Sequence, residues 1–288
     1  MIRDIKGLLS FIKEDIKENM DVAVLGLSGG VDSLVCACLL KTTLGEENVY
    51  AVHMPYGSVD LSKGKFNDNS LKIADKLEIN SLYRPIAETV DSLNKAISYD
   101  TLKQTSTHIT DLNKGNSRSR IRQCILYGIA HHLETELNKR TRVIGTGNLS
   151  EDYIGYDTKG GDALADLFLM GELLKSEVYQ LAEYFADNGL INRDMIDYNP
   201  SAGLWDGQTD EDELGYSYAD MEPSILKTRN PETGLSFQGY EIPVSGLNRT
   251  PLSKIDKFVL KRHLANRHKH LAPPTIPLRN FCEDIRSN

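Results

Sequence analysis

Residues 22–40, VAVLGLSGGVDSLVCACLL, constrain the fold more than any other part of the chain. An apolar run that favours a strand comes first, then two adjacent glycines, then the apolar pattern of a buried helix. Glycines in such a turn let backbone N–H groups point toward one centre, and the helix adds its own unpaired N–H groups. This order predicts a loop that binds phosphate although it contains no lysine. The alternative is a tight turn in which Asp32 is only a first-turn helix acid.

The rest of the chain alternates short β-branched runs with helical periods, which predicts an α/β fold: a Rossmann-like open parallel sheet flanked by helices. We expect strands at residues 22–27, 49–54, 82–86 and 143–145, and helices at 2–18, 33–42, 69–77, 120–136, 177–187 and 252–265. Residues 1–288 are expected to form one domain, with lid-like loops at about 99–117 and 199–250, where the apolar periodicity is lost.

Charge and composition disfavour several classes of protein. The net charge of −8 disfavours a nucleic-acid-binding surface, and no apolar run is long enough to span a membrane. The four cysteines have neither zinc-site spacing nor a disulfide pattern, which favours a reducing cytoplasm. The first helix carries charges throughout, unlike a signal peptide.

Two acids follow predicted strand ends. Asp32 would repel a phosphate by itself, so we interpret it as a ligand of Mg²⁺ that bridges to the phosphates. Glu151 follows the strand at 143–145, and the carboxyl ends of parallel strands meet at one edge of a sheet. We therefore predict that both acids converge on one Mg²⁺. Taken alone, Glu151 would be read as a solvated acid at a helix start.

The segment SGGVDS, residues 28–33, resembles the motif of the N-type ATP pyrophosphatases, which have an adenine nucleotide alpha hydrolase-like fold. Within them, TKGGD (158–162) and PSAGLWDGQTDEDELG (200–215) resemble the ammonia-dependent NAD synthetase family, and the similarity runs over residues 22–274. The resemblance implies that ATP adenylates the nicotinate carboxylate of deamido-NAD and releases pyrophosphate. Ammonia then displaces AMP. It also implies a homodimer.

The resemblance assigns roles to individual residues. The residues expected to contact ATP are Gly26, Leu27, Ser28, Gly29, Gly30, Val31, Asp32, Ser33, Thr146, Lys175 and Ser201. Asp32 and Glu151 are expected to bind Mg²⁺. The residues expected to bind deamido-NAD are Arg120, Lys159, Asp166, His268 and Lys269. Asp166 and Lys175 are the expected catalytic residues: our own hypothesis is that a small pocket near Asp166 strips a proton from ammonium, and that Lys175 offsets the charge of the phosphates. Ser201 stands where relatives often carry threonine, and ALAD (163–166) replaces the usual glycines.

Other interpretations stay open at this point. His268 and Lys269 fit equally well as the basic end of the helix at 252–265, and Lys175 as an exposed helix residue. Lys159, Asp162 and Asp166 fit a surface salt-bridge cluster. The acids at 210–213 fit a helix start capped by Thr209.

Rival functions are a GMP-synthetase-like core that acts on xanthylate, and a nucleotide sensor that releases no pyrophosphate. Position 2 is Ile2 rather than a cysteine nucleophile, so free ammonia or a separate partner subunit is expected to supply the nitrogen.

Overall fold

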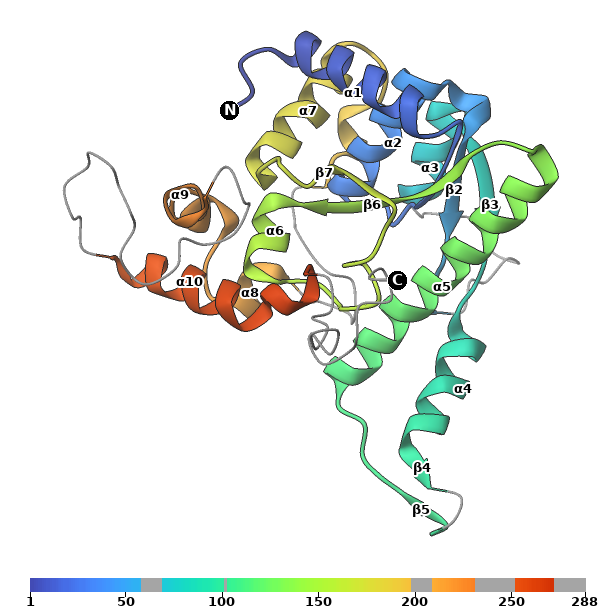
Figure 1. Ribbon diagram of the computed structural model, residues 1–288, viewed down its shortest axis with the longest axis vertical. Helices are drawn as coiled ribbons and strands as arrows, with labels where there is room; N and C mark the ends of the chain where they lie inside the picture. The colour runs from blue at the N-terminus through green and yellow to red at the C-terminus, as the bar shows by residue number, and fades with distance from the viewer. Residues whose placement is uncertain (58–68, 101–102, 198–208, 231–251, 272–288) are drawn as a thin grey trace, which may run out of the picture.

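The computed structural model describes residues 1–57, 69–100, 103–197, 209–230 and 252–271. Its centre is a five-stranded sheet in the order β3-β2-β1-β6-β7, in which every pairing is parallel (Figure 1). The strands are β1 (Val22–Gly26), β2 (Val49–His53), β3 (Asn80–Tyr83), β6 (Thr141–Asn148) and β7 (Leu167–Met170). The chain adds β2 and β3 on one side of β1 and then β6 and β7 on the other. This confirms the predicted fold class and places the reversal of strand order between β1 and β6.

Helices cover both faces of the sheet (Figure 1). One face carries α1 (Ile5–Asn19), α2 (Val31–Leu44), α3 (Asn69–Leu77) and α7 (Lys175–Asp187); the other carries α4 (Ala87–Ser98) and α5 (Asp111–Leu137). In β1, Ala23 and Leu25 pack into the core on the face that carries α2, and Val24 packs into the core on the face that carries α5, as strand alternation requires. Because β1 is buried on both faces, it has to be apolar throughout.

A smaller core lies beyond the carboxyl end of β6 (Figure 1). It is built by α6 (Leu149–Ile154), α8 (Asp210–Leu214), α9 (Tyr218–Thr228) and α10 (Lys254–Asn266). Short 3-10 turns occur at η1 (Glu46–Asn48), η3 (Arg193–Met195) and η4 (Arg267–Lys269). None of the helices in the described ranges is long and apolar enough to cross a membrane.

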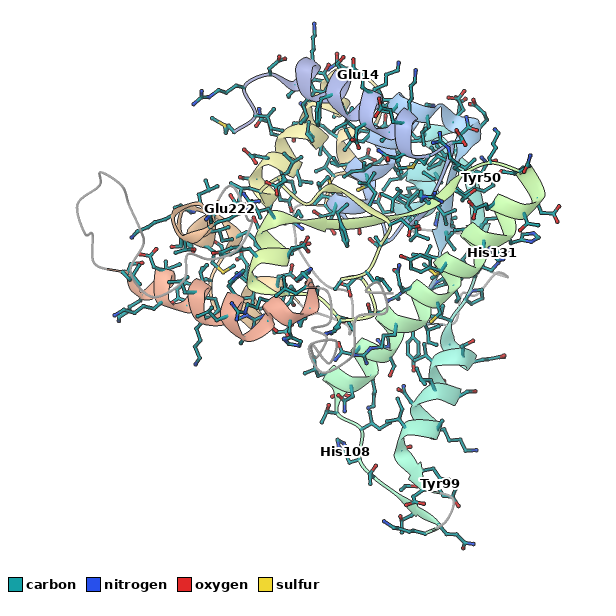
Figure 2. The ribbon with its side chains drawn as sticks, viewed as in Figure 1. Glu14, Tyr50, Tyr99, His108, His131 and Glu222 are labelled. Carbon is teal, nitrogen blue, oxygen red and sulfur yellow. The ribbon has the colours of Figure 1, made fainter. Side chains whose placement is uncertain are left out.

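The lid-like loop predicted at about 99–117 has regular secondary structure. It contains a small hairpin, β4 (Tyr99–Asp100) with β5 (Thr105–Ser106), and the first turns of α5. Tyr99 and His108 lie on this projecting arm (Figure 2). The buried residues in this part of α5 are small: Gly115, Ser117 and Ser119. The aliphatic pattern by which most helices are predicted from sequence is therefore absent here.

The predicted loop at 199–250 also contains helices. Thr209 caps α8 by accepting a hydrogen bond from the Asp212 N–H (3.2 Å), which confirms the capping interpretation of those acids. Helix α9 was not predicted. The parts at 198–208 and 231–251 lie outside the described residues, and the single-domain division stays a prediction.

Candidate active site

The glycine loop follows β1 at the point where the strand order reverses. Gly29 has a φ of 93°, and a Cβ there would lie 3.0 Å from the Ser70 nitrogen. Asn69, at the start of α3, donates to the Gly29 carbonyl (2.7 Å). Ser33 donates to the Gly30 carbonyl (3.0 Å). In the described chain no side chain caps α2 at Gly30, so the first-turn N–H groups face outward for an anion.

Asp32, Glu151 and Lys175 meet beside this loop. The Lys175 ammonium lies 2.6 Å from Asp32 Oδ2 and 2.8 Å from Glu151 Oε1. The lysine side chain is 4% exposed, and each carboxylate is 18% exposed. The acids therefore converge as the strand-end reasoning requires, whereas their role as metal ligands stays a prediction. The interpretation of Lys175 as an exposed helix residue is wrong.

The electrostatics of this cluster follow from burial and charge. Burial raises the pKa of Glu151, as does the neighbouring Asp32 carboxylate, while Lys175 opposes the rise. For Lys175, burial would lower the pKa, but the two carboxylates outweigh it and raise the pKa. The ammonium therefore stays charged between the acids. Carboxylate oxygens are also the ligands that Mg²⁺ prefers, so the donor chemistry fits that cation.

Several neighbours of the cluster were not found from the sequence. Ser150 accepts a hydrogen bond from the Lys175 N–H (3.0 Å) and donates to Glu222 (3.0 Å), which also accepts from the Ser176 N–H (3.0 Å). Glu222 belongs to α9 (Figure 2), so a distant helix supplies the cap at the start of α7. Asn148 Nδ2 donates to Asp32 Oδ1 (2.8 Å). These contacts join segments that are remote in sequence, so no local pattern predicts them.

The residues assigned to the second substrate form a chain of contacts. Arg120 Nε donates to the Lys159 carbonyl (3.2 Å), and Lys159 Nζ donates to the His268 carbonyl (2.9 Å). Lys269 Nζ donates to the carbonyls of Gly155 (2.7 Å) and Asp157 (2.7 Å). Lys269 therefore caps the end of α6, which is a structural role independent of any ligand.

Asp166 lies apart from that chain. Its Oδ2 accepts from the Val143 N–H (2.8 Å) and its Oδ1 from the Tyr127 hydroxyl (3.4 Å). Asp162 accepts from Ser119 (2.6 Å) and holds a turn, which disfavours the surface salt-bridge interpretation. Thr146 lies near the carboxyl end of β6, and Ser201 lies outside the described residues.

One further cluster has metal-ligand chemistry. Ligand atoms of Asp152, Asp157 and His270 lie within 4.8 Å of one another. The Asp157 carboxylate lies 2.5 Å from His270 Nε2 and 3.3 Å from Lys269 Nζ. Contact with Asp157 raises the pKa of His270, and Lys269 lies against the same carboxylate, so this acid already has two basic partners.

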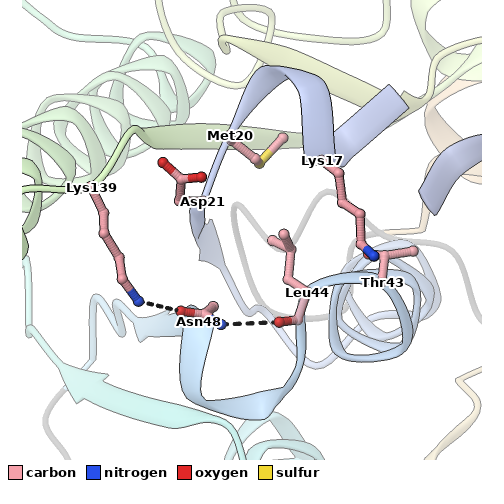
Figure 3. A pocket seen from close by; sticks show the side chains of 7 residues that line it. All are labelled: Lys17, Met20, Asp21, Thr43, Leu44, Asn48 and Lys139. Carbon is pink, nitrogen blue, oxygen red and sulfur yellow. Dashed lines mark hydrogen bonds between the residues drawn. The ribbon is translucent and has the colours of Figure 1, made fainter. Parts of the chain in front are cut away.

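A pocket of about 330 Å³ lies at the other end of the strands from the glycine loop, just before β1 and β2 begin (Figure 3). It is lined by Lys17, Met20, Asp21, Thr43, Leu44, Asn48 and Lys139. Lys139 donates to Asn48 Oδ1 (2.9 Å), and Asp21 pairs with Arg140 (3.0 Å). The carboxyl ends of α1 and α2 point here, so the helix dipoles disfavour an anion. None of the predicted site residues lines it.

Comparisons with known proteins agree with this arrangement. Residues 4–271 match the family model described as NAD synthase. The chain is 33% identical over 276 residues to the NH(3)-dependent NAD(+) synthetase of Methanocaldococcus jannaschii, covering 94% of this chain and 95% of that protein. It is 36% identical over 221 residues to the Fusobacterium nucleatum enzyme of the same name, covering 76% of this chain and 77% of the relative.

Two solved structures are also similar. The NMN synthetase of Francisella tularensis has a TM-score of 0.69 and 26% identity, with 94% of this chain and 96% of that chain covered. The NH3-dependent NAD synthetase of Campylobacter jejuni has a TM-score of 0.61, with the same identity and coverage. The family model matches nearly the whole chain, and the site has a glycine loop at the switch point beside two converging acids and a buried lysine. The chain therefore belongs to the NAD synthase family.

Proposed function

We propose that the protein catalyses the ATP-dependent amidation of deamido-NAD to NAD, with ammonia as the nitrogen donor and AMP and pyrophosphate as the other products. This is the last step of NAD biosynthesis, and it makes the protein a ligase that forms a C–N bond. The observation that carries the proposal is the meeting of Asp32, Glu151 and Lys175 beside an uncapped helix N-terminus, in a chain of this family.

The first step joins two anions, because a carboxylate attacks the α-phosphate of ATP. In the proposal, the N–H groups of the glycine loop hold the β and γ phosphates, which leave as pyrophosphate. Lys175 brings a positive charge close to the same phosphates. Mg²⁺, held by Asp32 and Glu151, would neutralise phosphate charge when bound.

The second step needs unprotonated ammonia. We assign the proton acceptor to Asp166, whose carboxylate accepts from Val143 and Tyr127 and is exposed. Arg120, Lys159 and His268 lie in one row and would bind the dinucleotide. Lys269 would support that row by holding the end of α6. We also propose a cytoplasmic homodimer that takes free ammonia.

The test mixes the protein with ATP, Mg²⁺, deamido-NAD and ammonium. Equal amounts of AMP, pyrophosphate and NAD are expected. Formation of ADP would overturn the proposal, because it requires cleavage at a different phosphate bond. Nucleotide binding without pyrophosphate release would favour the sensor interpretation, and turnover of xanthylate would favour the GMP-synthetase-like one.

A second substrate is worth a parallel assay because one of the similar structures is an NMN synthetase. Nicotinate mononucleotide carries the same carboxylate without the adenylate half. A higher kcat/KM with the mononucleotide than with deamido-NAD would move the proposal to that substrate and leave the chemistry unchanged.

A further inference from the structure

We propose that Asn148 is a positioning residue that fixes the two acids of the site relative to each other; the inference rests on the proposed function. Asn148 is 0% exposed and stands at the end of β6. Its Nδ2 donates to Asp32 Oδ1 (2.8 Å), and its Oδ1 accepts from the Glu151 N–H (3.1 Å). One side-chain amide therefore joins the start of α2, which carries Asp32, to the start of α6, which carries Glu151.

The bond to Asp32 sets the rotation of that carboxylate. With Oδ1 held by Asn148, Oδ2 faces the Lys175 ammonium at 2.6 Å. Without the amide, either oxygen can turn to the lysine and the carboxylate loses its fixed orientation. A cation that needs oxygens from both acids would then meet a site that has to be ordered on binding.

The bond to Glu151 sets the start of its helix. Asn148 is the N-cap of α6, and its side chain satisfies a first-turn N–H that has no partner within the helix. The register of β6 against β7 shifts between Gly145 and Asn148. Such an irregularity bends a strand end and re-aims its side chains, and here it accompanies a buried amide that contacts Asp32.

Only an amide performs both tasks at this position. Aspartate has the same shape and still caps a helix, but it cannot donate to Asp32 and adds a third carboxylate. Serine also caps, yet it is too short to replace the amide at Asp32. Alanine does neither. The variants Asn148→Asp, Asn148→Ser and Asn148→Ala therefore separate the bond to Asp32 from the cap on α6.

The experiment measures steady-state rates and nucleotide binding as functions of Mg²⁺ concentration. Calorimetric binding of α,β-methylene-ATP, which cannot be cleaved between these phosphates, gives a readout independent of turnover. For Asn148→Ser we expect the melting temperature to fall by only a few degrees, because serine keeps the cap on α6. The half-saturating Mg²⁺ concentration should rise about tenfold to a hundredfold, the usual effect of losing a hydrogen bond to a charged group. The KM for deamido-NAD should stay unchanged.

Asn148→Asp should show the largest loss of rate at low Mg²⁺, and more Mg²⁺ should recover much of it, because the added carboxylate attracts cations but repels Asp32. The control is Asp4→Ala, which removes the N-cap of α1, where Asp4 accepts from the Gly7 N–H (2.9 Å). This control should lower the melting temperature without changing the dependence on Mg²⁺.

Wild-type half-saturation by Mg²⁺ in both Asn148→Ser and Asn148→Asp would overturn the inference. A change of the same size in Asp4→Ala would also overturn it, since loss of stability alone would then explain the effect. Wild-type protein that binds the analogue but makes no NAD would refute the proposed function instead. In that case the Mg²⁺ dependence of analogue binding still decides the role of Asn148.

Discussion

Replacing Lys175 with methionine should destabilise the protein in a way that depends on pH and on Mg²⁺. The substitution keeps most of the side-chain volume and removes the ammonium that lies 2.6 Å from Asp32 and 2.8 Å from Glu151. Removing one partner of a buried ion pair costs about 3–5 kcal/mol, because the remaining charge is left uncompensated. For 288 residues the entropy of unfolding is about 0.6 kcal/mol/K, so the melting temperature should fall by about 5–8 °C.

In Lys175→Met, a carboxylate that has lost its partner can take up a proton, and this sets an upper limit on the loss of stability. Because the limit rises with pH, it gives the sign of the pH dependence. A carboxyl group with an unfolded pKa of 4.5 can be kept protonated for about 1.4 kcal/mol per pH unit above that value. The limit is about 2 kcal/mol near pH 6 and about 5 kcal/mol near pH 8. The melting temperature of Lys175→Met should therefore fall further below that of the wild type as the pH rises.

Thermal unfolding followed by circular dichroism, near pH 6 and near pH 8, with and without millimolar Mg²⁺, measures both effects. Mg²⁺ should recover part of the loss at the higher pH by taking the place of the ammonium. Lys114→Met is the control, since Lys114 forms an exposed pair with Asp111 (2.9 Å) that contributes little. Wild-type stability of Lys175→Met at both pH values would refute the electrostatic coupling of the three groups.

Three further changes test other parts of the structure. Gly29→Ala should weaken ATP binding about tenfold or more, as measured by calorimetry, because φ is 93° and the new Cβ would lie 3.0 Å from the Ser70 nitrogen. Glu222→Gln should lower the melting temperature and kcat together by removing the negative charge at the start of α7, at a cost of about 1–2 kcal/mol. Burial raises the pKa of Asp256, but hydrogen bonds, above all from Lys227, lower it more, to about 2. Its contribution to stability is present above pH 4 and lost as the pH falls toward 2, so Asp256→Asn should flatten acid unfolding in that range.

The sequence predicts the parts of the fold in which local pattern and burial agree. The strand at 22–26 is the middle strand of the sheet and the helix that follows packs against one face, so nearly every residue of both is buried and has to be apolar. Helix α4 (Ala87–Ser98) was missed because its only fully buried residue is Val90. Strand β7 (Leu167–Met170) was missed because four residues at the sheet edge give too short a run.

The candidate site divides in the same way. The convergence of Asp32 and Glu151 is predictable because both follow neighbouring parallel strands, and topology brings those ends together. The contacts of Asn148 and Glu222 cannot be predicted from the sequence, because they depend on how α2, α6, α7 and α9 pack. Local sequence indicates which acids reach the sheet edge, and tertiary packing decides which groups hold them there.

The charge of the cluster indicates how the proposed triphosphate site could work in a loop without lysine. When Asp32 and Glu151 are both ionised they carry two negative charges against the one positive charge of Lys175, so the three groups together are then negative and oppose a phosphate. A divalent cation reverses the sign and leaves a positive cluster beside the uncapped N-terminus of α2. Lys175 therefore does not replace the lysine of other phosphate-binding loops one for one. It keeps two buried acids together in the absence of a metal, and it follows that nucleotide binding should depend on Mg²⁺ more steeply than in a loop that carries its own lysine.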